Sequence, residues 1–425
     1  MSETARRRIS YPAILAGLFF LWPIVAYMGG QGFTAGVALA AIPVLFFARP
    51  RSVPLYAMVF IAFMAWTVVS SAWSSAGGGL FEGSFADNTF ALNAASVRIG
   101  LTALCIGGVI FAATQVEPYA PRSLAIFKAI PAVQALGVVV TALFMGAILQ
   151  ALAFSSDPVT EMPQNMMRNV NALTLILPLL SVWLWTRGGL AYRAAAIVWP
   201  IAIAWAGLVI GSEAAVLAIL LIGVASLIVW RFQRTGFLAL FTALGAYIML
   251  APLIFGGLMQ MLRGSGLPIP ASFWSRVHAW DSVTDRVTDS ALIGHGLEAT
   301  KTWGETYRDE PARLAEIIAD TGLPNAGWEA YSIVPGHPHN MALQIWAETG
   351  FVGALLAAVT CLLIGVRLYQ LGPIPHIARY AGAGLFAAAF TYFAFSYSMW
   401  NEAFWASVAL AAAVVILHGR YAADL

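Results

Sequence analysis

Long apolar runs alternate with short polar connections through most of the chain. A run of about 17 to 25 apolar residues is long enough to cross the hydrocarbon core of a bilayer as a helix. Read in this way, the sequence predicts twelve spans near residues 11–28, 33–48, 54–73, 99–116, 123–153, 170–186, 192–211, 214–230, 237–259, 342–366, 380–400 and 403–418. The pattern therefore predicts an all-α integral membrane protein in which residues 1–425 form a single polytopic domain.

The composition agrees with this prediction. Hydrophobic residues make up 60% of the chain and charged residues only 10%, whereas a soluble domain carries about 25% charged residues. The 22 basic and 20 acidic residues leave a formal net charge of +2. This balance is unlike that of a general nucleic-acid binder, so no nucleic-acid partner is expected and the placement of the charges is more informative than their sum.

Basic residues are concentrated on alternate connections between the predicted spans. Only Arg98 and Arg168 fall on the short connections of one set, whereas thirteen arginines fall on the other. These thirteen are Arg6, Arg7, Arg8, Arg49, Arg51, Arg122, Arg187, Arg193, Arg231, Arg234, Arg367, Arg379 and Arg420. By the positive-inside rule the richer set is cytoplasmic, so both termini are expected inside and the N-terminal segment reads as a retained anchor.

One long hydrophilic insertion, residues 260–340, falls on the outer side in this topology. It holds four of the six histidines and ten of the twenty acidic residues, so the chemistry is expected outside the cytoplasm. Helical spacing predicts an amphipathic helix over 274–287 and a second helix over 311–320 that ends near Gly322.

A polar stripe begins where the insertion meets the span near 342–366. His339 directly precedes this span, and Asn340, Gln344 and Glu348 recur at i, i+4, which places them on one helix face. A helix N-terminus favours an anionic group such as a pyrophosphate. A neutral histidine there can accept a proton from a hydroxyl group near neutral pH. The plainer reading is a histidine that caps a wet helix end.

Two outward-facing arginines are candidates for binding phosphate. The planar guanidinium of Arg276 can hold phosphate oxygens bidentately, and Trp274 and Trp280 are expected to seat its helix at the membrane interface. Arg168 is the second candidate, whereas Arg98 reads as a snorkelling or paired arginine.

The remaining polar residues of the insertion give weaker signals. His337 is a candidate helper of His339, whereas His278 and His295 are expected at the surface. Three aspartates, Asp281, Asp285 and Asp289, recur at i, i+4, but carboxylates on a surface helix are usually solvated. No metal or cofactor motif stands out, and the absence of a nucleotide-binding motif favours a lipid as the activated donor.

The sequence around His339 resembles a known family. His339-Asn340, nine further residues and Gly350-x-x-Gly353 lie within "PHNMALQIWAETGFVGALL", which is similar to the signature of the bacterial O-antigen ligase and O-antigen polymerase family. Arg276-x-x-x-Trp280 and the later Gly-x-Gly element, "LIGHG", resemble the elements that precede this signature. Twelve spans with one large periplasmic loop between two late helices are also typical of that family.

The resemblance implies a metal-independent, inverting glycosyltransferase of the inner membrane without a covalent enzyme intermediate. In that reading a glycan on undecaprenyl pyrophosphate enters from the bilayer, Arg276 and Arg168 hold the pyrophosphate, and His339 activates the acceptor hydroxyl. Supporting roles are expected for Asn340, Glu348, Glu213, His337 and Trp280.

One position departs from the family pattern. Many members carry a Ser-Arg pair after the seventh span, whereas this chain has Ser212-Glu213. Glu213 either orients Arg276 or Arg168, or marks an altered acceptor specificity, or is an exposed turn residue.

The acceptor distinguishes the functional alternatives. The preferred reading is a ligase that transfers the glycan to the lipid A core oligosaccharide. A polymerase would instead extend lipid-linked repeat units of O-antigen or exopolysaccharide. A flippase or transporter for lipid-linked sugars is the third alternative, but such proteins place charges at mid-membrane on broken helices, whereas the polar residues here gather in one outer loop.

Overall fold

The computed structural model describes residues 3–27, 32–47, 52–76, 94–115, 143–144, 161–262, 265, 267, 269–323 and 327–421. Within these ranges the chain is helical, and the only β-type pairing is an isolated bridge between Thr306 and Ser332. The helices are α1 (Glu3–Phe20), α2 (Trp22–Tyr27), α3 (Gly32–Ala41), α4 (Val44–Phe47), α5 (Leu55–Ser70), α6 (Ala95–Gln115), α8 (Glu161–Thr186), α9 (Leu190–Ile210), α10 (Glu213–Gly256), α11 (Leu258–Leu262), α12 (Ala271–Asp289), α13 (Pro311–Thr321), α14 (Met341–Gln370), α15 (His376–Phe395) and α16 (Glu402–Tyr421).

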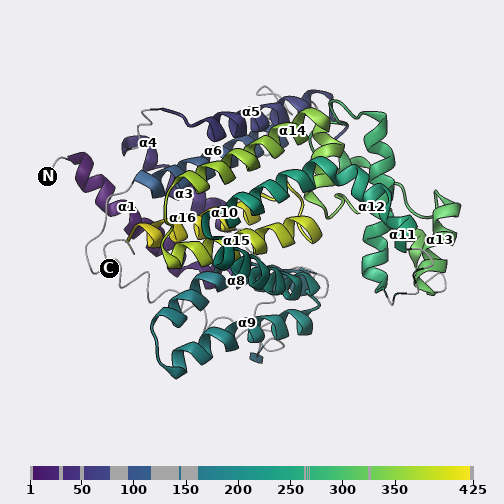
Figure 1. Ribbon diagram of the computed structural model, residues 1–425. Helices are drawn as coiled ribbons and strands as arrows, with labels where there is room; N and C mark the ends of the chain where they lie inside the picture. Colours follow the sequence, from purple (N-terminus) through teal and green to yellow (C-terminus); the bar gives the residue numbers. More distant parts are fainter. Residues whose placement is uncertain are drawn as a thin grey trace.

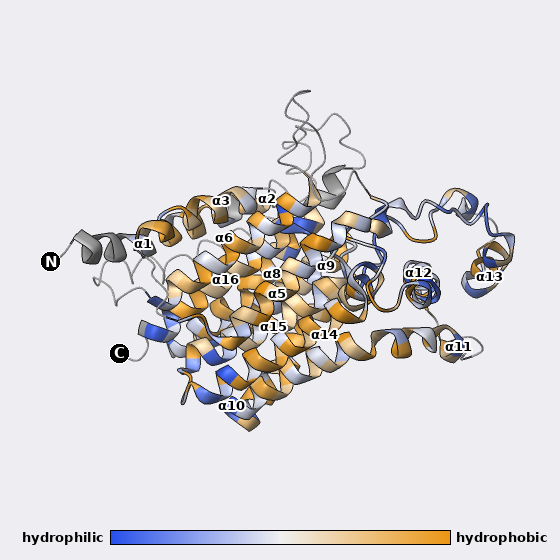
Figure 2. Cartoon of the chain, turned by 90° about the horizontal axis from the view of Figure 1, so that it is seen from above, coloured by the Kyte–Doolittle hydropathy of each residue, from blue (hydrophilic) through white to orange (hydrophobic). Residues whose placement is uncertain are grey.

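The long helices form one bundle (Figure 1). In that view α5 and α6 lie on one side of α14 and α15, α8 and α9 lie on the other, and α12 and α13 extend from one end. Figure 2 shows hydrophobic residues dominating the bundle and hydrophilic residues gathering over α12, α13 and the segments beside them. Among the described residues, seven helices are long and apolar enough to cross a membrane. The predicted class, an all-α multi-pass membrane protein, is confirmed.

The predicted count of twelve spans stays a prediction. The expected span at 123–153 falls almost entirely outside the described residues. Two other expected spans are interrupted: the helix near 11–28 breaks at Leu21 just before Pro23, and the helix near 33–48 breaks at Ile42-Pro43. Both breaks stand at a proline, which cannot donate a helical hydrogen bond.

The 44-residue helix α10 contains two spans rather than one. Gln233 has non-helical angles, φ 49° and ψ −117°, and the chain reverses there. A Cβ placed on Gly236 would lie 3.1 Å from the carbonyl oxygen of Ile228, although residues eight apart in a straight helix are separated by about 12 Å. The reversal lies between the two predicted spans near 214–230 and 237–259.

Helix α14 is broken at Gly350, where φ is 64° and ψ is −165°. The segment 291–296 lies against this break and pairs with it through backbone hydrogen bonds. The amides of His295 and Gly296 donate to the carbonyls of Ala347 and Glu348 at 2.8 and 2.9 Å. The amides of Phe351 and Val352 donate in turn to Ala291 and Leu292 at 2.8 and 3.2 Å. The carbonyls and amides freed by the break are therefore satisfied within the protein, as a broken helix in a membrane requires.

This backbone contact gives the glycine elements of the sequence a structural reason. Gly294 and Gly350 both have positive φ angles, and a Cβ on Gly350 would lie 2.5 Å from the amide nitrogen of Gly294. Two tryptophans pack against this backbone contact. Trp66 in α5 donates to the carbonyl of Thr349 at 2.9 Å, and Trp73, three residues after the end of α5, donates to the carbonyl of Gly294 at 3.1 Å. Only glycine allows the backbones to approach so closely.

The two helices predicted within the insertion are confirmed as α12 and α13, and α13 ends at Gly322 in the left-handed conformation. Arg313 of α13 binds Asp281 at 3.1 Å and Asp285 at 2.9 Å on α12. Two of the aspartates that share a face of α12 therefore hold the two helices together.

Three expectations about α12 and the segment after it were wrong. Trp274 and Trp280 do not seat α12 at a membrane interface, because both are buried inside the protein. His278 is fully buried and contacts Asp320 of α13 at 3.0 Å through Nε2. His295 is half-buried, with Nε2 2.8 Å from the carbonyl oxygen of Arg286. The sequence showed the polar side chains but not the packing of α13 over α12.

The contact between segment 291–296 and α14 predicts a steric effect at Gly294. Changing Gly294 to alanine would bring a Cβ within 2.5 Å of the amide nitrogen of Thr349, so the backbone must move. We expect a loss of about 2–4 kcal/mol in unfolding free energy, seen as a lower thermal transition in detergent. Gly322→Ala is the matched control, because Gly322 also has a positive φ but stands in open space. It should cost only about 1 kcal/mol, and equal effects of the two changes would contradict this account.

Candidate active site

His339 occupies a strained backbone position directly before α14. Its φ is 49°, which is uncommon for a residue with a side chain. Trp280 holds the preceding residue, since its indole donates to the carbonyl of Pro338 at 2.7 Å. Asn340 caps α14 by accepting from the amides of Ala342 and Leu343, both at 3.1 Å. The plainer reading of His339 as the helix cap is therefore wrong, because Asn340 fills that role and occupies two of the free amides at the helix end.

The ring of His339 has a defined tautomer. Its Nδ1 lies 2.8 Å from the carbonyl oxygen of Ser396. A carbonyl can only accept, so Nδ1 carries the proton and Nε2 is the acceptor in the neutral ring. Burial lowers the pKa of His339, the bond to Ser396 raises it, and the charge of Arg276 lowers it. Among the described residues no hydrogen bond occupies Nε2, so a neutral His339 offers a lone pair there.

His337 is the neighbour of this ring. The two ring centroids are 4.1 Å apart, and the amide of His339 donates to Nδ1 of His337 at 3.1 Å. Burial, then the charges of His339 and Lys301, lower the pKa of His337 to about 3. His337 is thus a neutral ring that shapes the turn before α14.

The two predicted arginines approach from different helices. Arg276 on α12 is half-buried and donates to the carbonyl of Ser272 at 3.2 Å. Burial lowers the pKa of Arg276, whereas the charge of Glu213 raises it. No direct ion pair of Glu213 is found among the described residues, so its carboxylate acts on Arg276 through space. Arg168 on α8 is half-buried.

A chain of hydrogen bonds joins Arg168's helix to the turn that carries Glu213. Ser212 donates to Oδ1 of Asn171 at 2.9 Å, and Nδ2 of Asn171 donates to the hydroxyl of Tyr397 at 3.3 Å. Burial raises the pKa of Tyr397 to about 12. The hydrogen bond with Asn171 and the positive charge of Arg168 lower this pKa, but burial has the larger effect. Tyr397 directly follows Ser396, the partner of His339. The structure therefore gathers the predicted site residues around one short segment, residues 396–401, which we call the connector.

Glu348 lies on the other side of the connector and is fully buried. Its carboxylate accepts from the hydroxyl of Thr300 at 2.6 Å, the amide of Glu298 at 2.7 Å, the side chain of Gln344 at 3.1 Å and the indole of Trp400 at 2.5 Å. No cation binds this carboxylate among the residues that the structure describes, so we call the four donors around it the carboxylate cage. The predicted stripe of Gln344 and Glu348 thus ties the end of the long insertion, α14 and the connector together.

The sequence pattern did not predict the connector as a break between two helices. A span was expected to run to residue 400, but α15 ends at Phe395. Gln344 holds the following residues, because its side chain bonds to the hydroxyl of Ser398 at 3.1 Å and accepts from the amide of Met399 at 2.8 Å. The polar residues at 396, 398 and 401 were the available signal for this interruption.

The fold and this site define a multi-pass membrane protein whose polar site lies where the long insertion, residues 260–340, meets the start of the broken helix α14. Residues 196–358 match the family described as O-Antigen ligase (Wzy_C). The resemblance seen in the sequence is thereby confirmed over this part of the chain, and the match supports a membrane enzyme of ligase or polymerase type that uses lipid-linked glycans. No curated protein matches the chain. The matched region includes Arg276, His339 and Glu348, whereas Arg168 and the connector lie outside it.

The carboxylate cage predicts that Glu348 does not tolerate a neutral amide. Glu348→Gln replaces an acceptor by an NH₂ donor, so at least one buried N–H of the cage loses its partner. We expect a loss of about 1–3 kcal/mol in unfolding free energy, measured by thermal unfolding in detergent. Asp289→Asn is the control, because Asp289 is exposed at the end of α12 and forms no ion pair among the described residues; it should change stability by less than about 0.5 kcal/mol. If Glu348→Gln leaves the unfolding free energy unchanged, the carboxylate cage is not required for stability.

The surroundings of His339 predict a neutral ring in mildly acidic solution. A histidine in an unfolded peptide is half protonated near pH 6.5, and burial beside Arg276 lowers the pKa of His339. We expect ¹⁵N-histidine NMR spectra at that pH to show His339, assigned with a His339→Gln variant, mostly neutral with the proton on Nδ1. Arg276→Gln removes a nearby cation and should raise the pKa of His339. A ring that is mostly protonated at pH 6.5 would contradict this picture.

Proposed function

We propose that the protein is an O-antigen ligase-like glycosyltransferase of the bacterial inner membrane. It moves a glycan from undecaprenyl pyrophosphate to the lipid A core oligosaccharide on the periplasmic face, with both termini in the cytoplasm. The observation that carries the proposal is the 2.8 Å contact between Nδ1 of His339 and the carbonyl oxygen of Ser396, which leaves Nε2 as the acceptor atom of a neutral ring. The half-buried cation Arg276 lies near enough for its charge to lower the pKa of that ring.

The proposed step is a direct displacement. Nε2 of His339 takes the proton of an acceptor hydroxyl as its oxygen attacks the anomeric carbon of the donor glycan. The bond from that carbon to the pyrophosphate oxygen breaks, and its electron pair leaves with the pyrophosphate. The configuration inverts and no covalent intermediate with the enzyme forms. No metal or cofactor is required in this scheme.

The pyrophosphate is proposed to lie between Arg276 and Arg168. Burial strengthens electrostatic attraction because the surrounding medium is less polar than water. Glu213 stands where many family members carry arginine, and its charge acts on Arg276. We propose that Glu213 orients Arg276 toward the donor, so that two cations rather than three hold the pyrophosphate.

Ligase and polymerase share this site and differ in the acceptor. The match to a family described as a ligase supports transfer to the lipid A core. A polymerase that extends lipid-linked repeat units is the outcome that the assay must separate.

The test is transfer in vitro by purified protein from a glycan on undecaprenyl pyrophosphate, with lipid A core as acceptor and without nucleotide or metal. Loss of a general base should lower kcat/KM about 10²–10⁴-fold in His339→Ala. Arg276→Ala should mainly raise the KM for the donor. His376→Ala and Arg308→Ala are matched controls, because both side chains are exposed and lie away from the site.

Each outcome has a distinct meaning. A product on lipid A core that depends on His339 supports the ligase. Longer lipid-linked chains that depend on His339 make the protein a polymerase with the same site. If neither product depends on His339, the proposed function is wrong and transport of lipid-linked sugars becomes the leading reading.

A further inference from the structure

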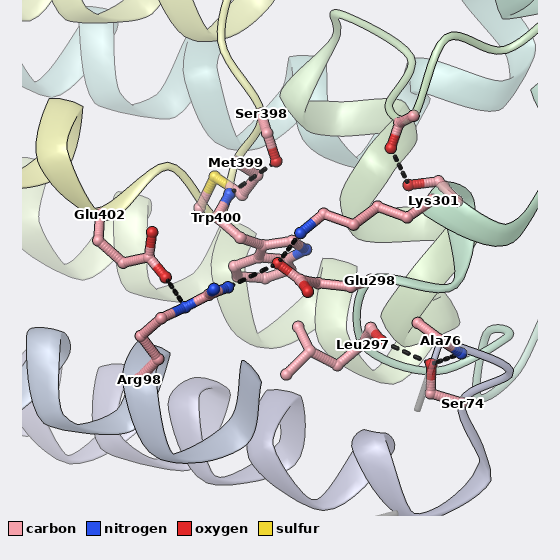
Figure 3. Close-up of polar contacts among 12 residues, drawn as sticks. Ser74, Ala76, Arg98, Leu297, Glu298, Lys301, Ser398, Met399, Trp400 and Glu402 are labelled. Carbon is pink, nitrogen blue, oxygen red and sulfur yellow. Dashed lines mark hydrogen bonds and ion pairs between the residues drawn. The ribbon is translucent and has the colours of Figure 1, made fainter. Parts of the chain in front are cut away.

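Arg98 joins two segments that lie far apart in the sequence. It stands in the first turn of α6, with its side chain 37% exposed. Its Nη2 lies 2.9 Å from Oε1 of Glu298 in the long insertion, and its Nε lies 2.5 Å from Oε1 of Glu402 at the start of α16. Figure 3 shows the guanidinium reaching between the two glutamates, with Trp400 beside them. One planar cation therefore ties the insertion to α16.

Both glutamates are also connected to the carboxylate cage. The amide of Glu298 donates to Oε2 of Glu348 at 2.7 Å. The indole of Trp400, two residues before Glu402, donates to the same oxygen at 2.5 Å. Arg98 closes these contacts into a ring, because it joins Glu298 to Glu402. The insertion and the connector are thus held together by two routes, one through Glu348 and one through Arg98.

Glu298 adopts a backbone conformation that favours glycine. Its φ is 59° and its ψ is 11°, in the left-handed region where a Cβ is unfavourable. A glycine would relieve this strain but would lack the carboxylate that pairs with Arg98. Lys301 binds the same carboxylate oxygen at 2.5 Å. The side chain of Glu298 is only 11% exposed, so its charge is held between two cations. Glu298 therefore belongs to the ring through both its backbone and its side chain.

The connector runs from the histidine contact to the ion pair with the guanidinium. Its first residue, Ser396, accepts from Nδ1 of His339 at 2.8 Å, and its last residue, Asn401, directly precedes Glu402. The side chain of Asn401 caps α16 by accepting from the amide of Phe404 at 2.8 Å. Glu402 thus lies in the first turn of a capped helix. Its ion pair therefore fixes one end of the connector.

The ring of His339 depends on the connector. Among the residues that the structure describes, the carbonyl of Ser396 is the only hydrogen-bond partner of this ring. Within the same set, Arg276 is the cation whose charge lowers the pKa of His339. An effect of Arg98 on the ring is therefore transmitted through the connector and not by a direct interaction of charges.

From this arrangement we infer that Arg98 is a positioning residue for His339. Its ion pairs with Glu298 and Glu402 hold the connector against α14, and the connector holds the ring with its proton on Nδ1. The inference rests on the proposed function for the use of that ring as a base. It adds a positioning group outside residues 196–358, the part of the chain that matches the family.

The first test observes the ring directly and needs no substrate. Arg98→Ala removes both ion pairs, so we expect the neutral ring of His339 to exchange between its two tautomers. In ¹⁵N-histidine NMR spectra the resonances of its two ring nitrogens should move toward each other. Arg286→Ala is the matched control, because Arg286 has a similar exposure, 27%, and its ion pair with Glu305 at 2.7 Å lies away from the connector.

Two results of this test overturn the inference. One is an unchanged tautomer in Arg98→Ala. The other is a shift of the same size in Arg286→Ala, because the ring would then respond to the loss of any ion pair.

The second test measures glycan transfer and asks whether Arg98 acts through Glu402. We expect Arg98→Ala to lower kcat about tenfold and to leave the donor KM within about twofold of wild type, since a reacting group displaced by about 1 Å can lose about 10²-fold in rate. Glu402→Ala should lower kcat to a similar extent. The double variant should fall no further than either single variant, because the two residues act as one unit. Additive losses, or a change confined to the donor KM, overturn the inference.

A stability control keeps both tests interpretable. If Arg98→Ala fails to fold by its thermal transition, Glu402→Ala replaces it in both tests, because that change leaves the pair between Arg98 and Glu298 in place. Glu402→Ala must then shift the tautomer of His339 and lower kcat. An unchanged tautomer or an unchanged kcat in a folded Glu402→Ala protein overturns the inference.

The two tests separate the positioning role from the proposed function. A tautomer that depends on Arg98, in a protein that transfers no glycan, would refute the proposed function and leave the positioning role. Transfer that depends on His339, with a tautomer and a kcat that do not depend on Arg98, would refute the positioning role alone.

Discussion

The approach of segment 291–296 to the break in α14 is the contact on which the rest of the site depends. Gly294 and Gly350 bring two backbones together where no Cβ fits, and four backbone hydrogen bonds hold them. Because the break is satisfied in this way, the first part of α14 can end at the polar site while the second part crosses the bundle. The same contact delivers Glu298 and Thr300 to the carboxylate of Glu348.

A second consequence is the shape of the connector between α15 and α16. Gln344 and Glu348 bind Met399 and Trp400, so the connector wraps the first turns of α14 instead of continuing α15. Ser396 then orients the ring of His339 through its carbonyl group. One buried carboxylate therefore helps to position a histidine ring that it does not touch.

The charges divide between the two sides of this connector. The charge of Arg276 on α12 acts on His339 and that of Arg168 on α8 acts on Tyr397, whereas Arg98 of α6 forms ion pairs with Glu298 and Glu402.

The sequence alone determined the helical membrane class, the two helices of the insertion, the reversal near Arg231 and Arg234, and the candidate base and arginines. These features follow from apolar run length, helical spacing and residue chemistry, all of which are local. It did not reveal the connector, the cage around Glu348, the burial of His278 or the pairing of Arg98 with two glutamates. Each of these depends on which distant segments meet, and a polar side chain carries the same local pattern whether it faces water or a partner. Only the tertiary structure decided that, because the backbone contact at Gly294 and Gly350 sets which side chains come within hydrogen-bonding distance.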